Sequence, residues 1–201
     1  MNTIKENSKA AFNQQAATYD KDIKGQHARS LYPVLLESCR TFRFNLLDLG
    51  CGTGEMLKLI LQKDPHKELC GIDLSEEMLA VAKSKLPEQV KLLLGDSEAL
   101  PFPDNAFDVV YCNDSFHHYP APQNVLREVN RVLKPGGTFL MGDCWQPFVG
   151  RVIMNFYMRH SKEGDVKIYS EAELVSMLSA YFHNVSWEQV GNTACIAMCE
   201  K

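Results

Sequence analysis

Five short apolar runs separated by helix-like segments constrain the fold of this 201-residue chain more than any other feature. The runs are Asn45–Leu49, Glu68–Asp73, Val90–Leu94, Phe107–Cys112 and Thr138–Asp143. They are rich in Leu and Val and mostly lack polar alternation, which is typical of parallel strands covered on both faces. Amphipathic segments at Glu55–Gln62, Glu76–Lys85 and Pro122–Leu133 lie among them. The pattern predicts an α/β fold with a Rossmann-like, doubly wound sheet.

The segments on both sides of this core also have regular patterns. Two helices are predicted before the core, at Glu6–Tyr19 and Gln26–Thr41. After it we expect a helix at Phe148–Arg159, a second helix opened by Ser170, and strands at Asn184–Gln189 and Thr193–Cys199. The chain has no internal repeat or linker, and its length fits one domain. We expect a helical cap at 1–43, the core at 44–143, an insertion at 144–169 and a C-terminal helix and strands at 170–201.

Composition narrows the function classes. A formal charge of −4 gives no general attraction for nucleic acid or for anionic membranes. No apolar run approaches the roughly 20 residues of a membrane span, and Met1–Ala10 is too polar for a secretory signal. The seven cysteines form no paired CxxC elements, so we expect reduced thiols, no metal and a cytoplasmic location.

The segment Leu46–Glu55 (LLDLGCGTGE) carries the clearest functional signal. A buried strand runs into a glycine-rich turn and then a helix, and ligands bind at that end of such sheets. The dinucleotide fingerprint GxGxxG would place a third glycine where Glu55 stands, and a carboxylate there would repel a pyrophosphate. S-adenosylmethionine has no phosphate and its sulfonium is cationic, so it avoids that conflict.

Acidic residues follow the next two predicted strands. Asp73 ends the second strand, where its carboxylate can accept from both ribose hydroxyls; capping the following helix is the alternative. Asp96 follows the third strand and can accept from an adenine amino group, or be a turn aspartate. Leu74 and Met78 would pack on the adenine or on the core.

Four blocks resemble the class I S-adenosylmethionine-dependent methyltransferases, particularly the ubiquinone/menaquinone-biosynthesis-type branch of small-molecule enzymes. They are LLDLGCGTGEM (46–56), GIDLSEEML (71–79), GDSEALPFPDNAFDVVYCNDSFHHYP (95–120) and REVNRVLKPGG (127–137). The resemblance implies a seven-stranded sheet whose last strand is antiparallel. It also implies cofactor contacts at Asp48, Gly50, Gly52, Asp73, Asp96, Ser97 and Asn113. Tyr19 falls in a segment similar to the family's cap, where it would close over the cofactor or simply pack.

Methyl transfer from a sulfonium is an in-line displacement that needs a base only if the acceptor must lose a proton. His117 and His118 follow the fourth strand, beside the expected methyl group, and either could be that base. The alternative is that both begin a helix or pack beneath the site. We expect no metal here, because adjacent histidines should point in different directions.

The acceptor pocket is expected to form from the cap and from residues 145–169, whose apolar side chains would otherwise pack on the core. The predicted activity is methyl transfer to a small molecule by a monomer or homodimer. A nucleic-acid or protein methyltransferase is one alternative, although the segment after the fourth strand, Asn113–Phe116, lacks the two prolines of enzymes that methylate planar amino groups. A non-catalytic module that binds the cofactor is the other.

Overall fold

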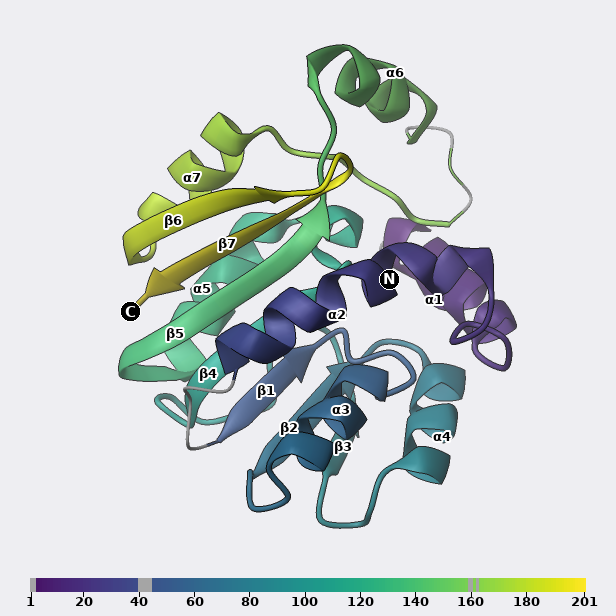
Figure 1. The fold of residues 1–201 in the computed structure, drawn as a ribbon, viewed down its shortest axis with the longest axis vertical. Helices are drawn as coiled ribbons and strands as arrows, with labels where there is room; N and C mark the ends of the chain where they lie inside the picture. The colour runs from purple at the N-terminus through teal and green to yellow at the C-terminus, as the bar shows by residue number, and fades with distance from the viewer. Residues whose placement is uncertain (1–2, 40–44, 159–160, 162) are drawn as a thin grey trace.

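In the computed structural model, which describes residues 3–39, 45–158, 161 and 163–201, a seven-stranded sheet carries helices on both faces (Figure 1). The strands are β1 (Leu46–Leu49), β2 (Leu69–Asp73), β3 (Lys91–Leu94), β4 (Phe107–Asn113), β5 (Leu133–Cys144), β6 (His183–Val190) and β7 (Ala194–Glu200). Their order across the sheet is β3-β2-β1-β4-β5-β7-β6. Strands β1 to β5 pair in parallel, whereas β7 is antiparallel to both β5 and β6. The expected sheet with an antiparallel last strand is confirmed.

The helices fall close to their predicted positions. They are α1 (Thr3–Gln15), η1 (Ile23–Gly25), α2 (Gln26–Cys39), α3 (Glu55–Lys63), α4 (Glu76–Lys85), η2 (Phe116–His118), α5 (Pro122–Val132), α6 (Phe148–Met158) and α7 (Glu171–Ser179). The prediction that the first helix continues to Tyr19 is wrong. Arg29 donates to the carbonyl oxygens of Tyr19 and Asp22, and these contacts hold the chain in turns after α1. The predicted ends of α2 at Thr41 and α6 at Arg159 lie outside the described residues.

One strand boundary also differs from its prediction. The Lys134–Gly137 segment was expected as a turn, but β5 already begins at Leu133. Leu133 pairs with Phe107 and Thr138 pairs with Val109, so the residues between them form a bulge within the strand.

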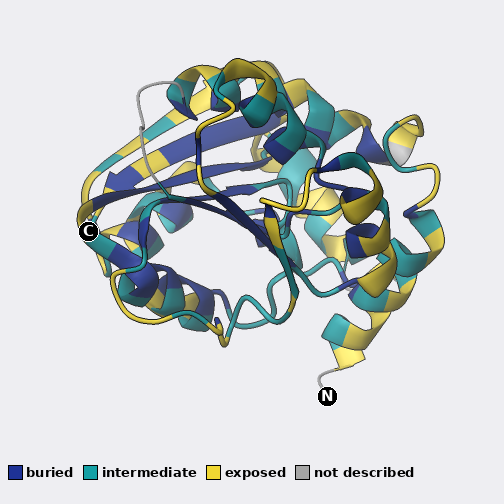
Figure 2. Cartoon of the chain, turned by 90° about the horizontal axis from the view of Figure 1, so that it is seen from below, coloured by how far each residue is buried: buried dark blue, intermediate teal, exposed yellow. Residues whose placement is uncertain are grey.

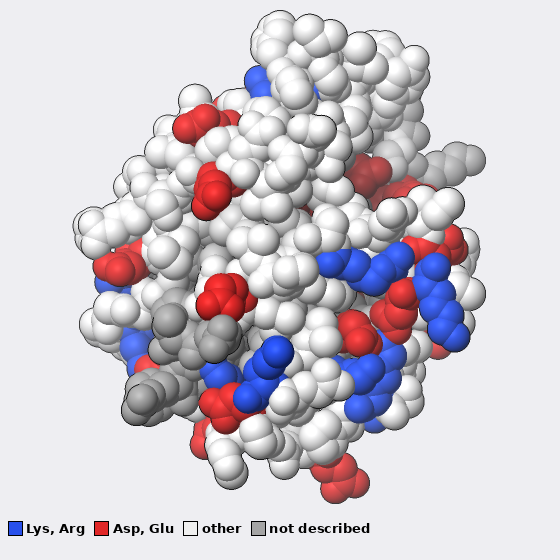
Figure 3. Space-filling model, in the orientation of Figure 1, with Lys and Arg blue, Asp and Glu red and all other residues white. Residues whose placement is uncertain are grey.

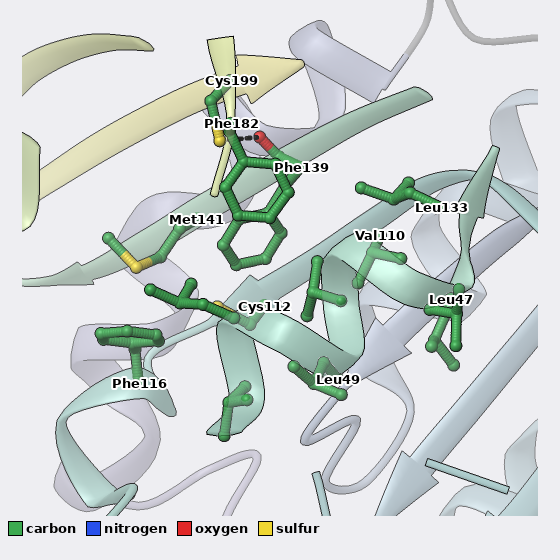
Figure 4. Close-up of a cluster of buried hydrophobic side chains, with 14 of the residues drawn as sticks. Leu47, Leu49, Val110, Cys112, Phe116, Leu133, Phe139, Met141, Phe182 and Cys199 are labelled. Carbon is green, nitrogen blue, oxygen red and sulfur yellow. Dashed lines mark hydrogen bonds between the residues drawn. The ribbon is translucent and has the colours of Figure 1, made fainter. Parts of the chain in front are cut away.

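The two faces of the sheet are buried against different helices (Figure 2). Because side chains alternate along a strand, Leu46 of β1 joins the cluster formed with α2, α3 and α4, whereas Leu47 and Leu49 join the cluster formed with α5 and α7. Figure 4 shows the second cluster, in which Phe139 and Phe182 pack with their ring centroids 5.8 Å apart. Burial on both faces explains why the strand sequences lack polar alternation.

The strand order reverses between β1 and β4. From β1 the chain builds outward to the edge strand β3, and it then returns to place β4 on the other side of β1. The loops that leave β1 and β4 therefore diverge, and such a reversal point is where open α/β sheets bind ligands.

Helix α6 projects from the rest of the molecule beyond β5 (Figure 1). It contains no buried residue, and its apolar side chains are exposed, among them Phe148, Val149, Phe156 and Tyr157. Among the described residues, no helix has the length and apolar character needed to cross a membrane.

Candidate cofactor site

A glycine-rich loop at the carboxyl end of β1 forms the floor of the site. Gly50 has a φ of +77°, and a Cβ atom there would lie 2.9 Å from the Cβ of Ser115, so this position requires glycine. Gly52 has a φ of +51°, but a Cβ atom there would meet nothing within 4 Å. Close packing therefore explains why residue 50 is glycine, whereas the space beside Gly52 is open.

That open space belongs to a cavity at the strand-order reversal, with about 990 Å³ of empty volume including its mouth. All ten residues assigned to the cofactor from the sequence line it: Tyr19, Asp48, Gly50, Gly52, Asp73, Leu74, Met78, Asp96, Ser97 and Asn113. Residues predicted from separate motifs are thus brought together on one cavity wall.

Asp73 holds the glycine loop in place. Its Oδ2 accepts a hydrogen bond from the backbone nitrogen of Gly52 at 2.7 Å, and its Oδ1 accepts one from Ser75 at 2.8 Å. The alternative prediction, that Asp73 caps the start of the following helix, is therefore confirmed for its contact with Ser75. Each carboxylate oxygen has two acceptor positions, so the same side chain can still accept from a ligand in the cavity.

Asp48 is the most deeply buried carboxyl group of the site, with 2% of its surface exposed. Tyr111 donates to its Oδ2 at 2.8 Å. Desolvation raises the pKa of Asp48 to about 8, against the lowering effect of that hydrogen bond. Asp73, Asp96 and Asp114 line the same cavity.

Asn113, at the end of β4, contributes a further acceptor. Its Nδ2 donates to the carbonyl of Ala28 at 3.1 Å, whereas its buried Oδ1 has no hydrogen-bond partner. A buried acceptor without a partner is costly, because water can no longer satisfy it. A donor group of a bound molecule would satisfy this atom.

The N-terminal segment closes the site through polar contacts that sequence reasoning missed. Lys5 pairs with Asp96 at 2.6 Å and with Glu98 at 2.8 Å. Asp20 accepts from Thr53 of the glycine loop at 2.5 Å and pairs with Lys85 of α4. These pairs join residues far apart in the chain, and no local motif signals them.

Asp96 and Tyr19, which both line the cavity, also contact neighbouring residues. The Asp96 carboxylate accepts from Lys5 and, through Oδ1, from the backbone of Glu98, which is the turn contact considered as its alternative. The Tyr19 ring lies 6.1 Å from the Phe12 ring in an edge-on arrangement. Burial raises the pKa of Tyr19, which keeps its hydroxyl neutral.

The two histidines have different surroundings. His118 lines the cavity, and its ring lies edge-on to Phe12 at 5.2 Å. His117 lies outside the cavity, where its Nδ1 meets the Oδ1 of Asp143 at 2.5 Å. The expectation that adjacent histidines point in different directions is wrong, since their ring centroids are 4.1 Å apart.

The protonation states of these rings also differ. Desolvation, with the charge of His117 beside it, lowers the pKa of His118 to about 4, so His118 is neutral at pH 7. Desolvation opposes protonation of His117 as well, but contacts with Cys144 and Asp143 outweigh it and raise the pKa of His117. A neutral ring can accept a proton, and a protonated ring held by a carboxylate cannot.

Two sequence arguments need correction. Among the described residues of the expected acceptor segment 145–169, none lines the cavity, and the exposed apolar residues of α6 do not pack on the core. Glu55, which was expected to repel a pyrophosphate, also lies outside the cavity and pairs with Lys58 at 3.1 Å and Lys85 at 3.4 Å.

Comparison with known proteins agrees with this fold and motif set. Residues 47–141 match a family model described as "Methyltransferase domain". The demethylmenaquinone methyltransferase of Listeria welshimeri is 37% identical over 123 residues, which cover 58% of this chain and 52% of that protein. The chain thus matches about half the length of such curated relatives.

Solved structures extend the likeness to most of the chain. The YcgJ protein of Bacillus subtilis superposes with a TM-score of 0.73 and 24% identity, over 87% of this chain and 99% of that one. A putative methyltransferase from a Haloferax volcanii complex with the Trm112 methyltransferase activator gives a TM-score of 0.78 and 22% identity, over 94% and 96%. At these identities the superpositions show the fold. Residues 47–141 thus match a methyltransferase domain in sequence, and most of the described chain shares the fold of these solved structures.

Proposed function

We propose that this protein binds S-adenosylmethionine in the cavity at the strand-order reversal and transfers its methyl group to a small-molecule acceptor. The observation that carries the proposal is the cavity itself, whose lining combines the glycine loop with Asp48, Asp73, Asp96 and Asp114. Asp96 and Asp114 are paired with Lys5 and His27, so Asp73, and Asp48 once it ionises, are the carboxyl groups that would attract a sulfonium and an ammonium group.

Each part of the cofactor has residues that suit it. Asp73 lies where it can accept from ribose hydroxyls, and Asp96 and Ser97 lie next to it on the cavity wall for the adenine. Leu74 and Met78 supply apolar surface. The unpartnered Oδ1 of Asn113 suits the methionine ammonium. The cap proposed for residues 1–43 contributes Tyr19 to the cavity lining.

The cofactor supplies an activated methyl group, so the contribution of the chain is mainly alignment. Holding two reactants in line can supply roughly 7–11 kcal/mol. His118 lines the cavity and is neutral, so of the two histidines it is the one that can accept a proton from an acceptor hydroxyl or carbon acid, although its lowered pKa makes it a weak base. His117 does not suit this role, because Asp143 holds it outside the cavity.

The relatives suggest which acceptor to test first. Several are named demethylmenaquinone methyltransferases, so we propose a reduced, demethylmenaquinone-like naphthoquinone as the first compound. The exposed apolar side chains of α6 offer a surface to such a hydrophobic molecule.

The proposed activity is tested by incubating the protein with S-adenosylmethionine, labelled at the methyl group, and a panel of small acceptors that includes reduced short-chain naphthoquinones. The expected result is a labelled, methylated product together with S-adenosylhomocysteine. Labelling of RNA or protein substrates instead would move the acceptor to another class. Tight cofactor binding with no turnover on any acceptor would favour a non-catalytic binding module.

A further inference from the structure

Beside the cofactor cavity, three side chains from two distant parts of the chain lie close together. His117 and His118 come from the η2 turn after β4, and Asp165 comes from the segment between α6 and α7. Single nitrogen and oxygen atoms of the three lie within 4.8 Å of one another. The Oδ1 of Asp165 is 3.4 Å from the Nδ1 of His118 and 3.9 Å from the Nε2 of His117.

Neither separation is a hydrogen bond, and the 3.4 Å between Asp165 and His118 is close to the spacing of two ligands of one metal ion. The Nδ1 of His118 is buried and has no hydrogen-bond partner, although a carboxylate oxygen faces it. A tetrahedral zinc site with bonds of about 2.0–2.1 Å places its ligand atoms roughly 3.3 Å apart. A cation between the three atoms would satisfy the orphaned nitrogen, which a plain packing role leaves unexplained.

The groups around the cluster are arranged as the supports of metal ligands usually are. The Nδ1 of His117 meets Asp143 at 2.5 Å, so its Nε2 would be the coordinating nitrogen once a metal ion displaces the proton that it carries in the metal-free protein. Ser161 donates to the Oδ2 of Asp165 at 2.5 Å, which leaves the Oδ1 turned toward the histidines. The backbone nitrogen of Val166 donates to the carbonyl of His117 at 2.9 Å, so the Asp165 segment is fixed against the turn.

A second cluster shares His117 but does not have the same spacing. It consists of His117, Asp143 and Cys144. The 2.5 Å between His117 and Asp143 is a hydrogen-bond distance, too short for two ligands of one ion. We regard it as the support of the first cluster.

We propose that His117, His118 and Asp165 bind a divalent first-row metal ion, zinc by preference, with a fourth position left for water or an acceptor oxygen. Imidazole and carboxylate ligands suit this class of ion, and three protein ligands are the number found in sites that keep an open position. Because His118 lines the cofactor cavity, the ion would lie beside it, and in the metal-bound protein His118 would be a ligand rather than the proton acceptor. The expectation of no metal, drawn from the sequence, is replaced by this proposal.

The proposal is tested by titrating metal-stripped protein with Zn²⁺ by calorimetry and with Co²⁺ by visible absorption. The expected result is one ion per chain and the intense bands of tetrahedral Co²⁺. Asp165→Asn and His118→Gln should each weaken affinity by at least about 10-fold, and Asp143→Asn by about 10- to 100-fold through loss of support for His117. The exposed His66→Gln should leave the affinity unchanged.

Each variant is first titrated with S-adenosylhomocysteine, which shows that its fold and cofactor site are intact. Equal Zn²⁺ affinity in wild type, Asp165→Asn and His118→Gln would overturn the proposal, as would absence of binding. Loss of the ion in Cys144→Ser with retention in Asp165→Asn would assign it to the second cluster instead. None of these outcomes depends on methyl transfer, so failure of the metal site and failure of the proposed function remain distinguishable.

Discussion

At the scale of single residues, Gly50 and Gly52 of the loop are glycines for different reasons, the first because of packing and the second because of access for a ligand. Gly50 is required by its contact with Ser115, whereas the space in front of Gly52 is free. Gly191 offers a matched comparison, because it also has a positive φ, +60°, and no atom near an added Cβ. The two positions differ mainly in that only Gly52 lines the cavity.

We therefore expect Gly52→Ala to weaken S-adenosylmethionine binding by 10-fold or more, while Gly191→Ala leaves it unchanged. Both variants should lose a similar stability, about 1–2 kcal/mol, because alanine is strained in the left-handed region. Calorimetric titration and thermal unfolding of the two variants measure these quantities. Equal affinity in both would show that the cofactor does not approach Gly52.

The raised pKa of Asp48 predicts that a proton is released when the cofactor binds. In the free protein its pKa is raised to about 8, so the group is mostly protonated at pH 7. A cationic ligand favours the carboxylate and lowers that pKa, so binding should release up to about one proton and strengthen as pH rises from about 6 to 8. Calorimetry at pH 7 in buffers of different ionisation enthalpy counts the protons.

The control for this prediction is Asp48→Asn, which cannot titrate. Its apparent binding enthalpy should depend less on the buffer, by the amount that Asp48 contributes in the wild type. An unchanged buffer dependence in the variant, or proton uptake by the wild type, would contradict a carboxylate that ionises beside the ligand.

At the scale of elements, helices α5 and α6 differ in how far their apolar side chains are buried. Helix α5 buries Val129 completely against the sheet, whereas Val149 of α6 is 67% exposed. The sequence of α6 is apolar, and we expected it either to line the acceptor pocket or to pack on the core. It does not pack on the core, because periodicity indicates a helix but does not say what covers it; its place in the acceptor pocket stays a prediction.

The same substitution in both helices tests this difference. Val129→Ala should cost about 1.5–3 kcal/mol of unfolding free energy, because two buried carbon groups are lost. Val149→Ala should change it by less than about 0.5 kcal/mol. Chemical denaturation of both variants provides the measurement, and a comparable loss at Val149 would show that α6 is covered in solution.

Prediction from sequence succeeded where the information is local. Strand ends and the turns after them are adjacent in the chain, and parallel strands bring those ends to one edge, so the residues from Asp48 to Asn113 were found. The contacts of Lys5 with Asp96, and of Asp165 with the histidines, join distant segments. No periodicity or motif records them, so they became visible only in three dimensions.

At the scale of the whole molecule, the sheet, the cap and the cavity form one binding arrangement. The reversal of strand order opens the cavity, and the glycine loop and four aspartates line one wall. The cap is held across it by ion pairs, notably Lys5–Asp96 and Asp20–Lys85. On the face shown in Figure 3, Lys and Arg lie among Asp and Glu near these elements, whereas the projecting part where α6 lies is mostly uncharged.

The most direct test of the account is calorimetric titration of the purified protein with S-adenosylmethionine and S-adenosylhomocysteine, with NAD as the control ligand. The account predicts one site per chain for the two adenosyl ligands, and no binding of NAD. Absence of binding by either adenosyl ligand to protein shown to be folded, or preferential binding of NAD, would contradict the assignment of the cavity.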